Sequence, residues 1–285
     1  MIINHKIAAL TATLTTAMSF LAAPAMAFSV GQTSNLQTLK DNLLGTNTAG
    51  LTDFSLSITG DPQGFGVFTD DPFGLESGIV LSTGRVTQLP GPNGSSGADL
   101  STDFGPSGSV GDLTELSLSF FADSTAEKLF FNYVFGSDEF LEFGGSGFND
   151  SFELLLNGTN LAKLNDGKTV TINNLVPNAG DRSQDNPDFI NNPVGGPGLA
   201  ASIIKLDGFT KVLGFEGLLK QNDTNVLTLR VKDVGDGIYD SAVFVQGKLG
   251  TIDPDETVPE PMTMGGLMAG GAMLAAGRKL RARRS

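Results

Sequence analysis

The sequence contains no cysteine and no tryptophan, and its single histidine is His5. Without cysteine, the chain has neither a disulfide framework nor thiol chemistry. Because His5 lies in a predicted leader, the remaining chain has no imidazole. This excludes Ser-His-Asp and Cys-His catalysis, histidine-ligated zinc and a histidine general base. The only tyrosines are Tyr133 and Tyr239, so a lectin that stacks sugars on aromatic platforms is also disfavoured.

Positive charge is scarce between residues 28 and 277. This region holds all 31 acidic residues but only 12 of the 18 Lys and Arg residues, which gives it a formal charge of −19. We therefore expect no binding to nucleic acid, and none to anionic lipid, by charge attraction. High solubility and binding of divalent cations are the natural consequences of such a charge.

The N-terminus has the pattern of a secretory signal peptide over residues 1–27. Lys6 supplies the positive charge, and an apolar run follows it. Ala25 and Ala27 are the small residues expected before a cleavage site. The sequence therefore predicts export by the Sec machinery and a mature chain that begins at Phe28.

The C-terminus combines a rigid turn, an apolar segment and a basic tail. The turn is formed by Val258, Pro259, Glu260 and Pro261. Its prolines have fixed φ angles, so it stays extended. The uncharged segment 262–277 would span ~24 Å as a helix, and a hydrocarbon core is ~30 Å thick. Snorkelling arginines of the tail 278–285 must therefore extend this short transmembrane helix, and the tail should stay cytoplasmic.

Between these ends, short alternating segments predict an all-β domain over residues 28–250. Alternation of polar and apolar residues predicts half-buried strands at 54–58, 116–120, 169–172 and 226–231. Denser apolar runs predict central strands at 78–82, 129–135, 152–156 and 242–245. One helix is expected at 34–44, and long loops are expected at 89–111 and 178–198. Many short strands joined by Gly, Asn and Asp turns are typical of a β-sandwich, here a jelly-roll-like one. Residues 251–257 form an acidic spacer before the C-terminal turn.

Two glycine-rich turns, each after a strong strand, concentrate carboxylates. The candidate ligands are Asp138, Glu139, Glu142, Asn149, Asp150, Asp233, Asp236 and Asp240. If the two turns meet, these oxygens would suit Ca²⁺, which takes about six to eight oxygen ligands. Their spacing does not match an EF-hand loop, and we expect a structural ion with no other cofactor. Alternatively, they are solvated turn residues, and partial burial would favour the ion.

The same carboxylates permit two other hypotheses. Glu139 or Glu142 with Asp150 could act as the acid pair of a glycoside hydrolase, which needs no histidine. Such a site also needs aromatic residues that position sugar, and the chain has no tryptophan. A Ca²⁺-dependent carbohydrate-binding module is the other alternative. We expect no catalytic residues and no enzymatic activity.

The C-terminal arrangement resembles the PEP-CTERM sorting signal of Gram-negative bacteria. The resemblance rests on the Pro-Glu-Pro motif at 259–261, the apolar segment and the basic tail. It implies recognition by an exosortase in the inner membrane, transient anchoring through the C-terminal helix and cleavage near the motif. The destination would be the cell surface or the extracellular matrix.

The interior resembles the choice-of-anchor L domain of bacterial surface proteins over roughly residues 39–248. Three motifs carry this resemblance, at 74–84, at 137–150 and at 235–244. The resemblance implies a surface domain carried by several kinds of C-terminal anchor, with no known enzymatic activity. We therefore expect a structural or adhesive protein of the cell surface or biofilm matrix, with exopolysaccharide or other surface proteins as partners.

Overall fold

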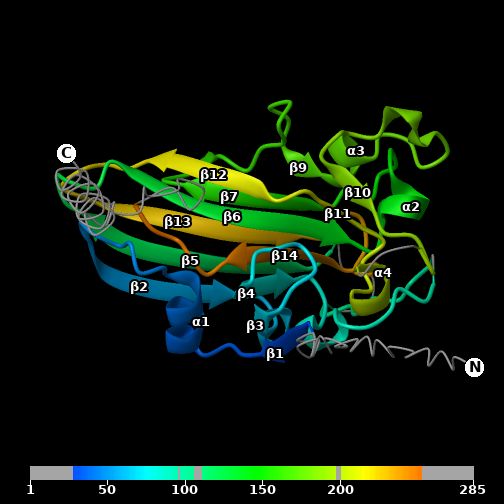
Figure 1. The fold of residues 1–285 in the computed structure, drawn as a ribbon, viewed down its shortest axis with the longest axis horizontal. Helices are drawn as coiled ribbons and strands as arrows, with labels where there is room; N and C mark the ends of the chain where they lie inside the picture. Colours follow the sequence, from blue (N-terminus) through cyan, green and yellow to red (C-terminus); the bar gives the residue numbers. More distant parts are fainter. Residues whose placement is uncertain (1–27, 96, 106–110, 197–199, 252–285) are drawn as a thin grey trace, which may run out of the picture.

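The computed structural model describes residues 28–95, 97–105, 111–196 and 200–251 (Figure 1). The predicted signal peptide and the C-terminal sorting signal, with its transmembrane segment, lie outside the described residues. None of the helices within the described ranges has the length and apolar character of a membrane span.

The described strands form two antiparallel sheets. In spatial order, the larger sheet contains β1 (Ser29–Gln32), β3 (Phe65–Thr69), β4 (Ser77–Ser82), β14 (Ser241–Gln246), β6 (Lys128–Ser137), β11 (Gly208–Thr210) and β10 (Phe189–Asn191). β12 (Leu213–Leu218) pairs with the first half of β6. The smaller sheet contains β2 (Leu51–Thr59), β5 (Leu113–Ala122), β13 (Asp223–Lys232), β7 (Ser151–Leu156) and β8 (Thr159–Asn160), and β9 (Val170–Thr171) pairs with β7. The α-helices are α1 (Leu36–Leu43), α2 (Phe140–Phe143), α3 (Ile172–Leu175) and α4 (Ala200–Ile203).

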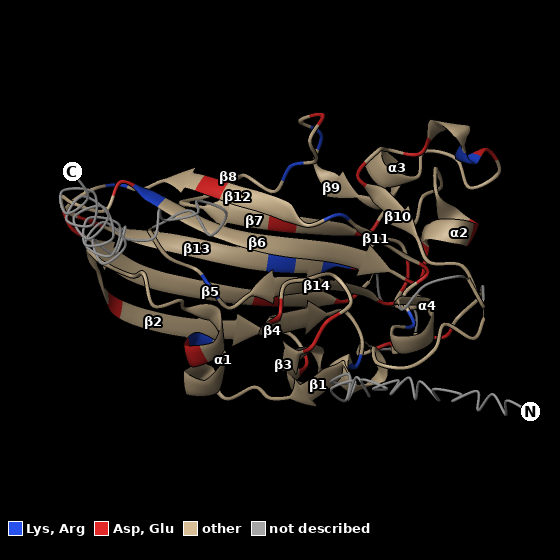
Figure 2. Ribbon diagram, in the orientation of Figure 1, with Lys and Arg blue, Asp and Glu red and all other residues tan. Residues whose placement is uncertain are grey.

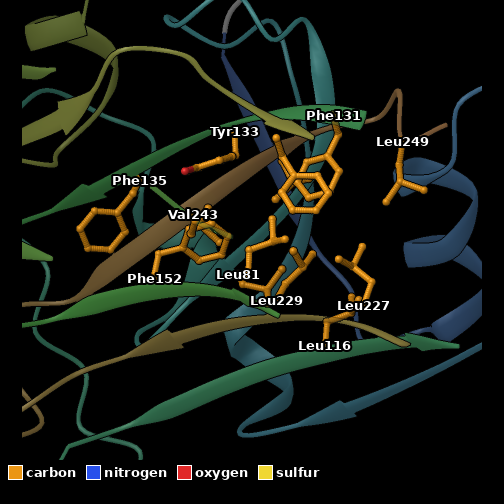
Figure 3. Packing of buried hydrophobic residues seen from close by; sticks show 14 of the residues in the cluster. Leu81, Leu116, Phe131, Tyr133, Phe135, Phe152, Leu227, Leu229, Val243 and Leu249 are labelled. Atoms are coloured by element: carbon orange, nitrogen blue, oxygen red, sulfur yellow. The ribbon is translucent and has the colours of Figure 1, made fainter. Parts of the chain in front are cut away.

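The two sheets pack face to face around one large apolar core, which confirms the predicted sandwich (Figure 1). In Figure 3, Phe131 and Leu81 of the larger sheet and Leu116, Leu227 and Leu229 of the smaller sheet belong to one cluster between the two sheets. Strands β5 and β13 bury alternate residues, as their period-two pattern predicts. The sandwich therefore forms because each sheet buries its apolar face against the other.

A second apolar cluster covers the outer face of the larger sheet. Val80, Val134 and Phe244 point away from the sandwich core and contact buried residues such as Leu100 and Leu206. Strands β4, β6 and β14 are therefore buried on both faces, which explains their dense apolar runs. The segments that carry Leu100 and Leu206 are held over the sheet by this packing. They thereby reach the end of β6, where the acidic residues lie.

The expected helix is confirmed, and an Asn-Gly turn forms a hairpin in the smaller sheet. Asn35 caps α1, because its Oδ1 accepts a hydrogen bond of 2.9 Å from the Thr38 N–H. Asn157 and Gly158 join β7 to β8, and both have positive φ angles, of 50° and 86°, as expected for an Asn-Gly hairpin turn.

Two expectations need correction. The run 169–172 forms a strand only at Val170–Thr171. Helix α3 begins at Ile172, because the Thr171 hydroxyl accepts a hydrogen bond from the Asn174 N–H. The expected loop 178–198 contains β10, which is held by pairing with β11.

Candidate functional site

The candidate site lies at one end of the sandwich, where three neighbouring strands of the larger sheet meet. Ser137 ends β6 and pairs with Ser241 of β14 on one side and with Gly208 of β11 on the other. Asp240 directly precedes β14, Asp207 directly precedes β11, and Asp138 directly follows β6. The Asp138 N–H donates to the Asp240 carbonyl at 3.1 Å. Antiparallel pairing therefore brings three aspartates to one edge.

The smaller sheet ends in the same way. Lys232, the last residue of β13, pairs with Ser151 of β7 and with Leu113 of β5. Asp233 directly follows β13, whereas Asp150 directly precedes β7 and Asp112 directly precedes β5. The Asp233 N–H donates to the Asp112 carbonyl at 2.9 Å. Figure 2 shows acidic ribbon segments gathered near the ends of β6, β11 and β14.

These carboxylates fall into two groups, because the consecutive residues Asp138 and Glu139 interact with different partners. The Glu139 cluster contains Glu139, Asp150, Asp233, Asp236 and Asp240. The Asp138 cluster contains Asp138, Glu142, Asp207 and Asn93. The two predicted turns therefore do meet, but their candidate ligands, apart from Asn149, divide between two clusters.

The Glu139 cluster contains carboxylates that are buried without a hydrogen-bond donor. Asp233 is 5% exposed, and neither of its carboxylate oxygens has a partner. Glu139 is 1% exposed, and its Oε2 is also unpartnered. Asp240 accepts a hydrogen bond from the Thr102 N–H at 3.1 Å, but its Oδ2 has no donor. Buried polar oxygens normally have a partner, so these carboxylate oxygens would be satisfied by a shared proton or by a cation.

Asp150 is the best-satisfied member of this cluster. Its Oδ2 accepts a hydrogen bond of 2.6 Å from the Ser241 hydroxyl, and its Oδ1 accepts one of 2.9 Å from the Val234 N–H. Its carboxyl group also lies within hydrogen-bonding range of the Glu139 carboxyl. Two carboxyl groups at this range need a shared proton or a bound cation between them.

Burial raises the pKa of every central carboxyl group in the cluster. For Glu139, burial is the largest cause, and the negative charges of Asp150 and Asp233 add to it. Burial raises the pKa of Asp233 to about 9, followed by the effect of Asp150. Burial likewise raises the pKa of Asp240 to about 7. These shifts mean that the site is electrostatically unfavourable when its carboxylates are all ionised and no cation is present.

Two predicted ligands are engaged in local hydrogen bonds. The Asn149 Oδ1 accepts a hydrogen bond of 2.9 Å from the Asn173 N–H, so this side chain is tied to α3. Asp236 is partly exposed, and its Oδ1 accepts a hydrogen bond of 3.2 Å from the Ile238 N–H. Asp236 nevertheless contributes to the electrostatic field at Glu139 and Asp233.

As the side chains stand, no three His, Cys, Asp or Glu residues in the described ranges are arranged to hold a metal ion. A cation hypothesis therefore rests on the buried oxygens without donors and requires carboxylates to turn toward a common point. The atoms in question are Asp138 Oδ1, Glu139 Oε2, Glu142 Oε2, Asp207 Oδ2, both oxygens of Asp233, and Asp240 Oδ2.

Sequence reasoning missed Asp207, Asn93 and Asp112. Asp207 and Asp112 each stand directly before a strand, β11 and β5. An aspartate directly before a strand is a pattern that could have indicated both residues. For Asp207 the pattern could not be recognised, because β11 is short and begins with glycine, so the strand itself was not predicted. Asn93 lies in the long loop 89–111, and only the fold brings it to Asp207.

Comparison with protein families gives a match to the Choice-of-anchor L domain over residues 29–249. No curated protein and no solved structure gave a significant match. The matched range begins at β1, ends after β14 and includes the whole acidic end of the sandwich. The chain therefore belongs to the choice-of-anchor L domain family, a kind of domain linked to anchored surface proteins.

Proposed function

We propose that this protein is an exported, non-enzymatic surface or matrix protein whose domain is stabilised by Ca²⁺ at the Glu139 cluster. Its role is structural or adhesive. The family supports a surface location, since choice-of-anchor domains are linked to anchored proteins. The single observation that supports the ion is the burial of Asp233, Glu139 and Asp240 with oxygens that have no donor.

Energetics favour a cation over an empty cluster. Placing an unpaired carboxylate in the interior costs several kcal/mol even after relaxation. In the described residues, no ion pair involves a member of the cluster. Arg85 acts on Asp240, but its effect on the pKa is smaller than that of burial. A divalent ion would replace the missing donors of several carboxylates at once.

The donor set favours calcium. The available ligands are carboxylate oxygens, with no thiol or imidazole in the mature chain. Hard cations prefer such oxygens, and Ca²⁺ tolerates irregular geometry better than Mg²⁺, which demands a near-octahedral shell. Gly235, which has a φ of 113°, lies in the turn between Asp233 and Asp236. It gives this turn a backbone conformation that other residues rarely adopt.

The position of the Glu139 cluster between the two sheets favours a structural role for the ion. Glu139 follows β6 of the larger sheet, whereas Asp150 and Asp233 flank β7 and β13 of the smaller sheet. An ion held by these residues would join the two sheets at one end of the sandwich.

The same burial argues against a hydrolase. Asp150 is fully buried and Glu139 is 1% exposed, whereas an acid pair for glycoside cleavage must flank a bond of the substrate. A cavity of about 540 Å³, lined by residues that include Leu156, Thr159 and Leu218, lies at the opposite ends of β7 and β12. No member of either acidic cluster lines this cavity.

Export and anchoring complete the proposal. The N-terminal 27 residues would direct Sec export, and the tripartite segment 258–285 would anchor the precursor in the inner membrane for an exosortase. The spacer 251–257 would then separate the domain from the membrane. The mature protein would remain at the cell surface or in the exopolysaccharide matrix of a Gram-negative bacterium.

Thermal unfolding of the exported protein, purified in mild detergent, tests the calcium part. Wild-type protein should melt at a clearly higher temperature in Ca²⁺ than in chelator, because the ion binds only the folded state. The Asp41→Asn variant is a matched control, since it makes the same chemical change at an exposed residue of α1. An unchanged melting temperature in chelator would refute the structural ion.

A further inference from the structure

The Asp138 cluster is built from three parts of the chain that are far apart in sequence. Asp138 follows β6, and Glu142 lies one turn later in α2. Asp207 precedes β11 and donates its N–H to the Ser137 carbonyl at 3.0 Å. Asn93 comes from the long loop after β4. The cluster therefore lies where the two covering segments meet the end of the larger sheet.

Asp207 is the centre of this cluster. Its Oδ1 accepts a hydrogen bond of 2.8 Å from the Asn93 side-chain amide. Its carboxyl group also lies within hydrogen-bonding range of the Glu142 carboxyl. Asp138 is near enough to Asp207 for their charges to repel each other. Asp207 thus lies near the carboxyl groups of Glu142 and Asp138 and bonds to the amide of Asn93.

Asp138, Asp207 and Asn93 each have one end that is satisfied by a hydrogen bond. Asp138 Oδ2 accepts hydrogen bonds of 2.9 Å from the N–H groups of both Asp99 and Leu100. The Asn93 amide nitrogen donates to the Asn192 carbonyl at 2.7 Å as well as to Asp207. These hydrogen bonds hold one oxygen of Asp138 and the amide nitrogen of Asn93, and binding of an ion would require the carboxylates to turn toward a common point.

The opposite atoms have no donor. They are Asp138 Oδ1, Glu142 Oε2, Asp207 Oδ2 and Asn93 Oδ1. Asp138 and Asp207 are fully buried, and Asn93 is 3% exposed. Buried acceptors without donors are costly, and the ion pairs of the described residues include none of these side chains. The common requirement of these acceptors is a cation that accepts oxygen ligands.

We propose that Asp138, Glu142, Asp207 and Asn93 form a second Ca²⁺ site, separate from the Glu139 cluster. Four acceptor oxygens leave room for backbone carbonyls or waters in a shell of about six to eight ligands. Three carboxylates and a neutral amide form a typical oxygen-only set for calcium. Asp138 and Glu139 are adjacent, so the two ions would be held on the two sides of one backbone segment.

Occupation of this second site would stabilise the packing of the segments that carry Leu100 and Leu206 against the outer face of the larger sheet. Asp99 and Leu100 bond to Asp138 through the backbone, and Leu100 belongs to the outer apolar cluster with Leu206. The ion would therefore tie the segments around Asn93 and Asp207 to the end of β6. The first ion would join the two sheets, whereas the second would join the larger sheet to the segments that cover its outer face.

Calcium stoichiometry of the full exported protein in detergent, measured by equilibrium dialysis after chelation, tests the proposal. Wild type should bind two ions. Asp207→Asn, which keeps the shape of the side chain, should bind one. Asp233→Asn should also bind one, by loss of the other site, and Asp41→Asn should bind two. Glu142→Gln is a second probe of the new site on a partly exposed residue, should Asp207→Asn fail to fold.

Hydrogen exchange identifies which of the two calcium sites each variant has lost. Ca²⁺ should slow exchange in residues 89–100 and 203–210 of wild type and Asp233→Asn, but not of Asp207→Asn. Wild-type stoichiometry and protection in both Asp207→Asn and Glu142→Gln would overturn the second site. A single wild-type ion that Asp233→Asn removes would overturn it too and leave the proposed function intact. No bound ion at all would refute both sites and point to carboxyl groups that share protons.

Discussion

Replacement of Asp233 by asparagine should change stability in opposite directions with and without calcium. In the metal-free protein, burial and the neighbouring charges raise the pKa of Asp233 from 3.8 to about 9. At ~1.4 kcal/mol for each pH unit between 3.8 and 7, this aspartate costs on the order of 4 kcal/mol at pH 7. Asparagine has a similar shape and no charge, so Asp233→Asn should remove most of that cost.

The assay is thermal unfolding at pH 7, in chelator and in excess Ca²⁺. One kcal/mol shifts the melting temperature by ~2–4 °C in a domain of this size, so the variant should melt up to roughly 8–16 °C above wild type in chelator. In Ca²⁺ the variant should melt below wild type, because it lacks a charged ligand. Asp41→Asn should differ from wild type by no more than about 2 °C in either condition. Equal destabilisation by Asp233→Asn in both conditions would refute the reasoning.

Three further predictions follow from the same structure. Burial raises the pKa of Asp138 to about 8 and those of Asp207 and Asp240 to about 7. The stability linked to these groups is complete below the unfolded pKa of 3.8 and is lost as pH rises through 7 to 8. Chelated protein should therefore melt at a higher temperature at pH 5.5 than at pH 8, and a melting temperature that rises with pH would contradict this. Phe131→Ala should cost about 3–5 kcal/mol in denaturant titrations in both Ca²⁺ and chelator, because it opens a cavity in the sandwich core; a loss below ~1 kcal/mol would contradict the core assignment. Deletion of residues 258–285 should move the protein from the cell envelope to the medium in fractionated cultures, and unchanged retention would contradict the proposed sorting signal.

Local pattern was enough to predict the centre of this fold. Strands β5 and β13 alternate because one face of the smaller sheet is buried. The dense runs in β4, β6 and β14 reflect burial on both faces. Strands β11 and β12 escaped prediction because they are short or contain glycines, such as Gly214 and Gly217, and are held by pairing with β6.

The candidate site could be predicted in part. The sequence predicted two acidic turns and left open whether they meet, and the pairing of β14 with β6 and of β13 with β7 brings them together. The direction of each side chain could not be predicted, because it depends on long-range hydrogen bonds. Asn149 bonds to the backbone of α3, whereas Asp207, which was not among the predicted ligands, stands at the centre of the second cluster.

The most direct test of the calcium account is a crystal structure of the domain grown with Ca²⁺, with anomalous data collected for the ion. The account predicts two peaks, one ~2.3–2.6 Å from oxygens of Asp233 and Glu139 and the other at the same distance from Asp138 and Asp207. Well-ordered carboxylates in millimolar Ca²⁺, with no peak between them and protons shared within Glu139–Asp150 and Glu142–Asp207, would contradict it.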